Sequence, residues 1–226
     1  MSAAGRLGIG IIGAGKVGPV LGAALAGAGH AIIGVAAVSE HNRERAKVML
    51  NDVAILEIPD LIERSELVIL AVPQSELATL VAGLAATGAW RPGQLVMHTA
   101  PGLGCTVLAP ATAAGAIPLA VHPAMVFTGT SVDLVRLRES YCAVTAPTAV
   151  LPIGQALVVE MGAEPVIIDE ADRAQYAEAV STATSFSAAI VHQALAMLAE
   201  LDVESPSSVL APLVRSSVES ALAAEA

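Results

Sequence analysis

The chain has 226 residues, enough for one well-buried core or for one domain with a smaller appendage. Its formal net charge of −10, with no stripe of basic residues, excludes nucleic acid as a partner. Hydrophobic residues make up 55% and aromatic residues only 2%, so small aliphatic side chains must build the core, which suits parallel strands covered by close-packed helices.

A charge-free run raises the question of a membrane span. Residues 92–132 contain no Asp, Glu, Lys or Arg, but prolines divide them at positions 92, 101, 110, 118 and 123. No apolar segment of about 18 residues remains, so we expect no membrane-spanning helix. The apolar start of the chain is not followed by a cleavage-site pattern. We therefore expect a cytoplasmic protein with no membrane partner.

A glycine-rich turn lies between two predicted strands, residues 7–12 and 31–38. Gly13, Gly15 and Gly18 form G-x-G-x-x-G directly after the first strand and open a predicted helix. The first glycine permits the tight turn, the second lets the backbone approach a pyrophosphate, and the third brings the helix close to the strand. A flavin site, an S-adenosylmethionine site and a ligand-free turn are the alternatives. We predict a dinucleotide bound by Gly13, Ala14, Gly15, Lys16, Val17 and Gly18.

Ser39 and Glu40 follow the second strand. Glu40 lies 22 residues after the last glycine of the motif, where a carboxylate would bind the ribose 2′-OH of NAD and repel the 2′-phosphate of NADP. Arg43 and Arg45 follow within one turn, and Ser39 with Asn42 could hold that phosphate instead. Glu40 could equally be a solvated charge. The expected cofactor is therefore NADP or NAD.

Short apolar runs continue to alternate with helix-length segments. The runs are residues 67–72, 94–98, 118–122, 141–145 and 164–169. This alternation predicts α/β architecture, a doubly wound parallel sheet of Rossmann-like type with helices on both faces. The first of these runs ends at Val72 and is followed by Pro73 and Gln74, which we expect to close the cofactor cleft.

Two of the later strands end in a histidine, His98 and His122. Ligands of open α/β sheets bind outside the carboxyl ends of the strands, so both side chains could approach the nicotinamide, with Thr99 contacting the cofactor. Either histidine could instead be held by a backbone carbonyl and fix its loop. For the two cysteines, Cys105 and Cys142, the spacing indicates neither a metal site nor a disulfide, so we expect buried thiols and no metal.

The character of the chain changes after its last glycine, Gly162. Residues 157–226 hold 11 acidic and 2 basic residues. One long helix is predicted from Glu170 to about residue 201, with acidic residues at its start where they favour the helix dipole. The Ser205-Pro206 pair predicts the start of a second helix, with Ser205 as its N-cap, up to about residue 224.

Two helices alone form no core, so they need the sheet domain or a second subunit as a partner. We prefer a homodimer formed through these helices. The expected organisation is a dinucleotide-binding domain over residues 1–168 and a small, all-helical dimerisation or substrate domain over residues 169–226. The sequence suggests a small-molecule substrate but does not identify it.

Three side chains are candidate proton donors: His122, His98 and Tyr176. No lysine is available from the C-terminal helices, because the chain has only Lys16 and Lys47. We expect the other histidines to be structural, with His192 inside the long helix and His30 and His41 on the surface.

The order of four motifs, GIIGAGKVG, LVILAVP, HTAPGLG and PLAVHPAMVFTGT, followed by a long helix near Tyr176, resembles a bacterial family of Rossmann-like proteins with a C-terminal domain of unknown function. That family belongs to a wider group similar to 6-phosphogluconate dehydrogenase in its helical C-terminal domain. The resemblance covers essentially the whole chain. It implies an NAD(P)-binding domain, a helical dimerisation domain and an oxidoreductase of undefined substrate. The glycine motif and the two histidine blocks lead us to expect hydride transfer to a small carbonyl or imine.

Several positions depart from the pattern of that family. Ala100-Pro101 stands where the family usually has Ser-Gly, Ala177 where it commonly has His, and Ser185 near an Asn position. The helical part is also shorter than the family's. These departures favour an alternative: a dinucleotide-binding dimer without catalysis, acting as a sensor or partner subunit.

Overall fold

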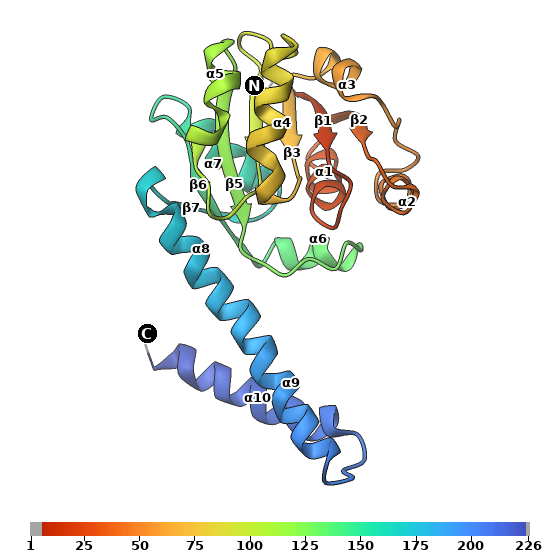
Figure 1. The fold of residues 1–226 in the computed structure, drawn as a ribbon, viewed down its shortest axis with the longest axis vertical. Coiled ribbons are helices and arrows are strands. Elements are labelled where there is room, and N and C mark those ends of the chain that lie inside the picture. The colour runs from red at the N-terminus through yellow and green to blue at the C-terminus, as the bar shows by residue number, and fades with distance from the viewer. Residues whose placement is uncertain (1–5, 225–226) are drawn as a thin grey trace. The chain divides into compact units, whose positions relative to one another are not determined.

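The computed structural model of the protein describes residues 6–224, which divide into two compact units with the boundary in the chain between Ala177 and Glu178. The first unit contains a seven-stranded sheet in the order β2-β1-β3-β4-β5-β6-β7 (Figure 1). Its strands are β1 (Gly8–Ile12), β2 (Ala31–Ala36), β3 (Leu67–Leu70), β4 (Leu95–His98), β5 (Ile117–Pro123), β6 (Tyr141–Thr145) and β7 (Glu164–Ile167). All seven predicted strands are present, and the predicted Rossmann-like α/β class is confirmed.

The sheet is mostly parallel. Every neighbouring pair runs parallel except β5 and β6, which pair antiparallel from Ala120 opposite Thr145 to Pro123 opposite Cys142. This reversal could not be predicted from the sequence, because an apolar run has the same pattern in either direction. As a result, β6 starts beside the carboxyl end of β5.

Helices cover both faces of the sheet, as expected for a doubly wound fold. They are α1 (Gly18–Gly27), α2 (Glu40–Met49), α3 (Ile58–Arg64), α4 (Gln74–Ala86), α5 (Ala109–Ala113), α6 (Val132–Leu137) and α7 (Leu151–Glu160), with short 3₁₀ helices η1 (Cys105–Leu108) and η2 (Glu170–Asp172). One apolar layer includes Leu21 and Leu157 from α1 and α7, and the other includes Leu61 and Leu77 from α3 and α4. Burying aliphatic side chains on both faces is what stabilises a parallel sheet.

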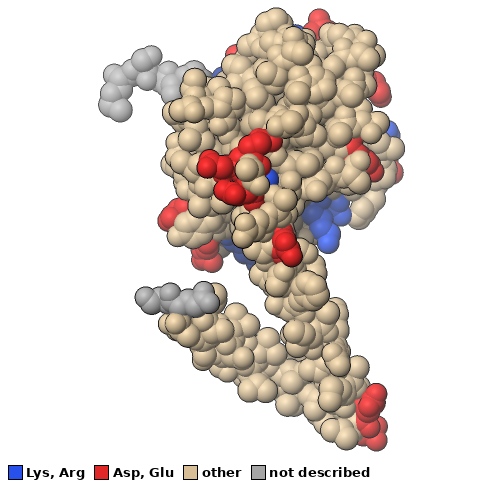
Figure 2. Space-filling view, turned by 60° about the vertical axis from the view of Figure 1, so that its left-hand side comes forward, with Lys and Arg blue, Asp and Glu red and all other residues tan. Residues whose placement is uncertain are grey.

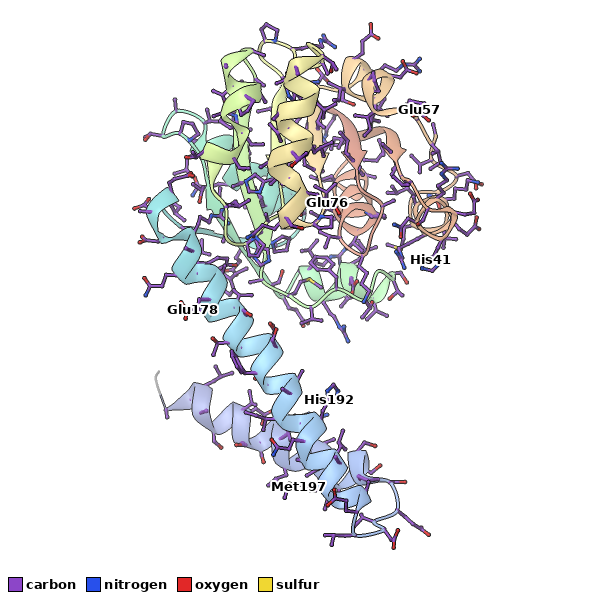
Figure 3. The ribbon with its side chains drawn as sticks, viewed as in Figure 1. His41, Glu57, Glu76, Glu178, His192 and Met197 are labelled. Atoms are coloured by element: carbon purple, nitrogen blue, oxygen red, sulfur yellow. The ribbon has the colours of Figure 1, made fainter. Side chains whose placement is uncertain are left out.

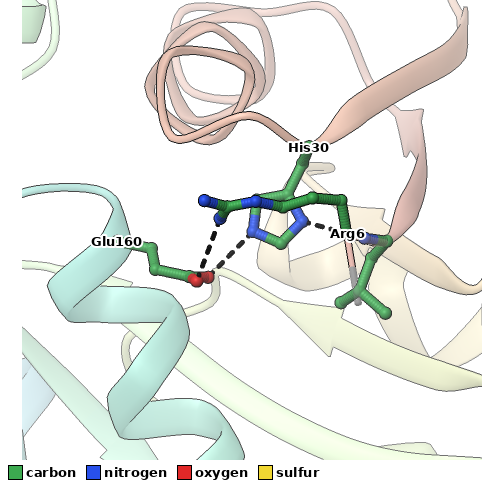
Figure 4. Close-up of polar contacts among 4 residues, drawn as sticks. Arg6, His30 and Glu160 are labelled. Atoms are coloured by element: carbon green, nitrogen blue, oxygen red, sulfur yellow. Dashed lines mark hydrogen bonds and ion pairs between the residues drawn. The ribbon is translucent and has the colours of Figure 1, made fainter. Parts of the chain in front are cut away.

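His30 is buried, which corrects its prediction as a surface residue. It stands just before β2, where its Nδ1 accepts a hydrogen bond from the Leu7 amide at 3.1 Å and its Nε2 lies 2.8 Å from Glu160 (Figure 4). Arg6 contacts the other oxygen of Glu160 at 3.3 Å. The contact with α7 joins residues 130 positions apart, which a local pattern cannot show. His41 is exposed, as predicted.

The predicted long helix is also present. It consists of α8 (Arg173–Ser181), a π-helical turn η3 (Thr182–Phe186) and α9 (Ser187–Ala199), and α10 (Pro206–Ala223) follows. Ser205 does precede the last helix, but its backbone is left-handed (φ 58°) and its side chain makes no capping hydrogen bond. The predicted domain boundary at residues 168 and 169 stays a prediction.

The helices of the second unit are apolar and exposed. No residue of α9 or α10 is buried, and the face of these helices seen in Figure 2 is largely uncharged. His192 and Met197 project from α9 (Figure 3), and the Met197 side chain is 60% exposed. The segment Glu170–Ala199 has an 18-residue window of mean hydropathy 1.2, none of it buried, so length and composition alone would allow it to cross a membrane. An exposed helix that packs on another protein meets the same criterion.

Candidate functional site

The glycine turn between β1 and α1 leaves room for a ligand. Gly13 has a φ of +102°, and a Cβ there would lie 2.3 Å from the Ala71 carbonyl oxygen; a Cβ on Gly18 would lie 2.2 Å from the Gly13 carbonyl oxygen. Side chains at these two positions would therefore clash with backbone. A Cβ on Gly15 would meet nothing within 4 Å. Only the middle glycine faces open space, as a backbone that approaches a pyrophosphate requires.

Two cavities meet at this turn and share Gly15, Ala71, Val72 and Pro73. The first has a volume of about 630 Å³ and lies along the ends of β1 and β2. The second, of about 440 Å³, is lined by His122 and Thr99 among others. We call them the β2 cavity and the His122 cavity. Together they could hold the two halves of a dinucleotide, with its pyrophosphate beside Gly15.

Most of the predicted cofactor residues line one of these cavities. The residues that do so are Gly13, Ala14, Gly15, Lys16, Val17, Val72, Pro73, Gln74 and Thr99. Gly18 instead starts α1 and is buried. Gln74 also holds the loop after β4, since its Oε1 accepts a hydrogen bond from the Gly102 amide at 3.0 Å.

Ser39 and Glu40 do not line the β2 cavity. The Ser39 hydroxyl caps α2 by accepting a hydrogen bond from the Asn42 amide at 3.3 Å. The Glu40 side chain is 77% exposed and lies 3.6 Å from Arg43. Asn42 and Arg43 line the cavity instead. Two carboxylates line it as well, Glu57 before α3 and Glu76 on α4, both labelled in Figure 3.

His98 is fully buried, and both of its ring nitrogens are used. Nε2 lies 2.9 Å from the Gly104 carbonyl, and Nδ1 accepts a hydrogen bond from the Ala100 amide at 3.2 Å. This bonding assigns the proton to Nε2. Burial lowers the pKa of His98 to about 4, so the ring is neutral at physiological pH. The arrangement fixes the loop after β4 and leaves neither nitrogen for a substrate.

His122 and Tyr176 are brought together although 54 positions separate them. The Nδ1 atom of His122 lies 2.8 Å from the Tyr176 hydroxyl, and the two rings meet edge to face. Burial lowers the pKa of His122 to about 4, assisted by the nearby Arg173 and His98. Burial also raises the pKa of Tyr176, and Arg173 opposes that rise. Of the two side chains, only that of His122 is among those lining the His122 cavity.

Arg173 is a site residue that the sequence analysis missed. Its side chain is 1% exposed, and its guanidinium donates hydrogen bonds to Thr145 Oγ1 at 2.6 Å and to the carbonyls of Ala120 at 2.8 Å and Ala143 at 3.1 Å. Its Cζ lies 5.9 Å from the centre of the Tyr176 ring. A signal was present: a basic residue at the start of a helix is unfavourable to the helix dipole and therefore needs another reason.

Glu170 caps a different helix from the one predicted. Its two carboxylate oxygens accept hydrogen bonds from the amides of Cys105 at 2.6 Å and Thr106 at 3.0 Å, at the start of η1. Burial opposes the charge, but these hydrogen bonds outweigh it and lower the pKa of Glu170. The acidic residue therefore joins η2 to the loop after β4 rather than only favouring the dipole of the long helix.

The thiols and carboxylates form no metal site within the described residues 6–224, where no group of three or more His, Cys, Asp or Glu side chains could hold an ion. Cys105 is partly buried, and its Sγ lies 3.2 Å from the Thr145 carbonyl. Burial raises the pKa of Cys105 to about 11 and that of Cys142 to about 12. Both thiols are therefore protonated and unreactive at neutral pH.

Two family models match the sequence. Residues 2–123 match the Rossmann-like domain, and residues 140–226 match a domain of unknown function (DUF2520). Together they agree with the resemblance inferred from the motifs. The second match begins before β6, so it includes two strands of the sheet as well as the C-terminal helices. No curated protein matches the sequence.

Several solved structures share the fold at low sequence identity. A candidate NADP oxidoreductase from Bacteroides fragilis is 20% identical, with a TM-score of 0.78 over 95% of this chain and 80% of that one. A 1-pyrroline-5-carboxylate reductase from Streptococcus pyogenes is 18% identical, with a TM-score of 0.71 over 97% and 80%. An imine reductase from a Pseudomonas species is 13% identical, with a TM-score of 0.70 over 97% and 76%. At these identities the likeness establishes the fold.

Proposed function

The chain belongs to the family of Rossmann-like domains, and from this premise we propose that it is an NAD(P)-dependent reductase of a small carbonyl or imine. The solved structures with a similar fold include, by their names, a 1-pyrroline-5-carboxylate reductase and an imine reductase. When bound, NAD(P)H would supply the hydride. The chain would supply the binding site and the proton.

One observation carries this proposal. Gly15 and Lys16 of the glycine turn line the same cavity as His122, whose ring is hydrogen-bonded to Tyr176. A dinucleotide with its pyrophosphate at Gly15 would extend its nicotinamide into the cavity that contains a proton-carrying side chain. Hydride transfer to a carbonyl or imine leaves a negative charge on oxygen or nitrogen, and a proton from this side would neutralise it.

The test is binding followed by turnover. NADPH and NADH are titrated while nicotinamide fluorescence is recorded, and oxidation is then measured with 2-oxo acids and cyclic imines. Gly15→Ala should weaken cofactor binding at least tenfold without loss of stability, since its Cβ would occupy only open space. Gly27→Ala, also free of clashes, is the matched control. Absence of binding would refute the proposal, and binding without turnover would favour the non-catalytic dimer.

We propose NADP(H) as the preferred cofactor. Arg43 and Asn42 line the β2 cavity, whereas Glu40 lies outside it with an exposed side chain. A guanidinium binds a phosphate through charge and paired donors, so Arg43 suits a ribose 2′-phosphate. Arg43→Gln should weaken NADPH binding about tenfold and leave NADH binding nearly unchanged. Equal losses for the two cofactors would contradict this preference.

We also propose a cytoplasmic homodimer formed through the C-terminal helices. Phe186, Ile190, Leu213 and Leu222 are each more than 60% exposed, and two helices with no buried residue cannot stabilise themselves. A second copy carries the same apolar surface and would bury it around a two-fold axis. Light scattering should give twice the mass of the chain, and Ile190→Glu should lower it. A monomer in the unmodified protein would refute this arrangement.

A further inference from the structure

We propose that Tyr176 is the terminal proton donor of the reaction, that His122 passes its proton to the substrate, and that Arg173 stabilises the tyrosinate that this leaves. The proposal rests on the reductase function proposed above and names the residues that would supply its proton. It stands on three features of the carboxyl end of β5: the His122–Tyr176 hydrogen bond, the separation of Tyr176 from the cavity, and the charge of Arg173.

His122 and Tyr176 differ in their access to the cavity. His122 lines the cavity that would hold the substrate, whereas Tyr176 is not among its lining residues. The tyrosine hydroxyl is bonded to Nδ1 of His122 at 2.8 Å. If the hydroxyl donates this bond, the ring carries its own proton on Nε2. A proton from Tyr176 can then reach the substrate only through the imidazole.

The charge of the His122 imidazole limits how it can donate a proton. Burial, with Arg173 and His98 nearby, keeps His122 neutral at physiological pH, since its pKa is about 4. An imidazolium donor is therefore scarce. A neutral imidazole that gave up its Nε2 proton alone would become an imidazolate, which is a very strong base. Simultaneous transfer from Tyr176 to Nδ1 avoids that anion.

Two protons move together in this transfer. The O–H bond of Tyr176 breaks as an N–H bond forms at Nδ1 of His122. The Nε2–H bond of His122 breaks as its proton joins the substrate oxygen or nitrogen that carries the negative charge after hydride transfer. The ring stays neutral, and the negative charge ends on the tyrosine oxygen, which later regains a proton from solvent.

Arg173 is placed to stabilise the negative charge on the tyrosine oxygen. Arg173 is fully buried beside the Tyr176 ring, and arginine keeps its charge in proteins. Among residues 6–224, no carboxylate lies within 4.0 Å of its guanidinium, and its Nη1 has no hydrogen-bond partner. A buried cation with no carboxylate in contact is costly, and an anion formed next to it would be stabilised.

Four other titratable groups surround the pair, and one of them, Glu170, is an anion. They are His98 from β4, Cys142 from β6, and Glu170 and Cys105, which face Arg173 from η2 and η1. His98 is committed to backbone partners, and both thiols are protonated. The Glu170 charge favours the charged form of Arg173, but the carboxylate is more than 4.0 Å from the guanidinium and both of its oxygens accept hydrogen bonds at the start of η1. Arg173 therefore acts as a positioning and electrostatic residue for Tyr176.

The first experiment needs no substrate. Tyr176 and Tyr141 are the chain's two tyrosines, and Tyr141 is exposed, so a Tyr141→Phe background isolates the ionisation of Tyr176 in the ultraviolet spectrum. Arg173→Met should raise the pKa of Tyr176 by about one unit or more, whereas the control Arg215→Met on α10 should not. An unchanged pKa in a folded Arg173→Met protein would overturn the role of Arg173.

The second experiment uses the unmodified chain and so does not depend on whether Arg173→Met folds. Nitrogen NMR of the histidine rings, with His122 assigned through His122→Gln, reports which nitrogen carries the proton. We expect the proton on Nε2 and an accepting Nδ1. A proton on Nδ1 would mean that His122 donates to Tyr176, and the relay would be refuted.

The third experiment applies to the active enzyme. Tyr176→Phe should lower kcat about 100-fold at unchanged KM, and combining it with His122→Gln should add little, because the two residues act as a unit. Full activity of Tyr176→Phe would overturn the relay and leave the reductase function intact. Expected results in the first two experiments without any turnover would instead refute the reductase function alone.

Discussion

Two histidines at opposite ends of the sheet show different ways of placing charge inside this protein. His30 stands before β2 and contacts Glu160, which also meets Arg6 at 3.3 Å. His122 stands near the end of β5, beside Arg173, for which no carboxylate partner lies within 4.0 Å in the part of the chain that the structure describes. The first cluster pairs its cation with a carboxylate in direct contact, and the second leaves a buried cation without such a contact.

This difference separates a stabilising cluster from one that can do chemistry. A charge that already has its partner gains little from a new anion nearby. A buried cation without a partner favours any state in which an anion forms next to it. We therefore expect changes at the His30 cluster to alter the free energy of unfolding and changes at the His122 cluster to alter turnover.

The largest expected effect is the loss of turnover in His122→Ala. Removing the ring interrupts the only path from Tyr176 to the cavity, so kcat should fall by roughly 10² to 10⁴, the usual range for general acid catalysis. His30→Ala is the matched control, and its turnover per folded molecule should equal that of the unmodified enzyme. A folded and fully active His122→Ala protein would assign His122 to packing.

The next effect is acid sensitivity that comes from the His122 end of the sheet. His98 and His122 have pKa values of about 4 in the folded chain, against 6.5 for an ordinary histidine. Between these two pH values the unfolded chain binds more protons than the folded chain. The free energy of unfolding therefore has its full value above pH 6.5 and falls as the pH drops towards 4. The loss should be on the order of a few kcal/mol, less for the partly exposed His122 than its pKa alone implies.

Urea unfolding at neutral pH and near pH 5 measures this loss. His122→Gln, which cannot gain a proton at this position, should show a smaller decrease in the free energy of unfolding than the unmodified chain. The exposed-site control His41→Gln should show the same decrease as the unmodified chain. An identical decrease in all three proteins would mean that His122 does not contribute to it.

The strands and the glycine turn could be predicted from the sequence because their signals are local. An apolar run of a few residues bounded by glycine or proline is typical of a strand wherever its partners lie. The same reasoning led correctly to His122 at a strand end. It could not supply Tyr176 as its partner, because the two residues are 54 positions apart and the return path of the chain between them is not determined by local patterns.

Arg173 and His30 show the same limit. Arg173 reaches carbonyls 30 and 53 positions away, and His30 is bonded to Glu160 130 positions away. Both contacts depend on the order of strands in the sheet, and the antiparallel pairing of β5 with β6 was itself not visible in the sequence. Composition could show only that a lone arginine at a helix start was unusual.

A smaller effect is expected at the His30 cluster. Glu160→Ala removes the contacts with His30 and Arg6 and should lower the free energy of unfolding by about 1 kcal/mol, because the carboxylate is partly exposed. Glu164→Ala, an exposed position at the start of β7, is the control. Thermal or urea unfolding measures the difference. A loss of kcat per folded molecule in Glu160→Ala would contradict the division between the two clusters.

The smallest effect concerns an arginine whose partner is exposed. Arg43 lines the β2 cavity and lies 3.6 Å from the Glu40 carboxylate, which is open to solvent. An exposed ion pair contributes well under 1 kcal/mol, so Glu40→Gln should release Arg43 and strengthen NADPH binding about twofold at low salt. The gain should disappear at high salt, where screening weakens the pair. Glu44→Gln, an exposed neighbour on α2, is the control. If NADH binding falls instead, Glu40 binds the ribose and the preferred cofactor is NAD.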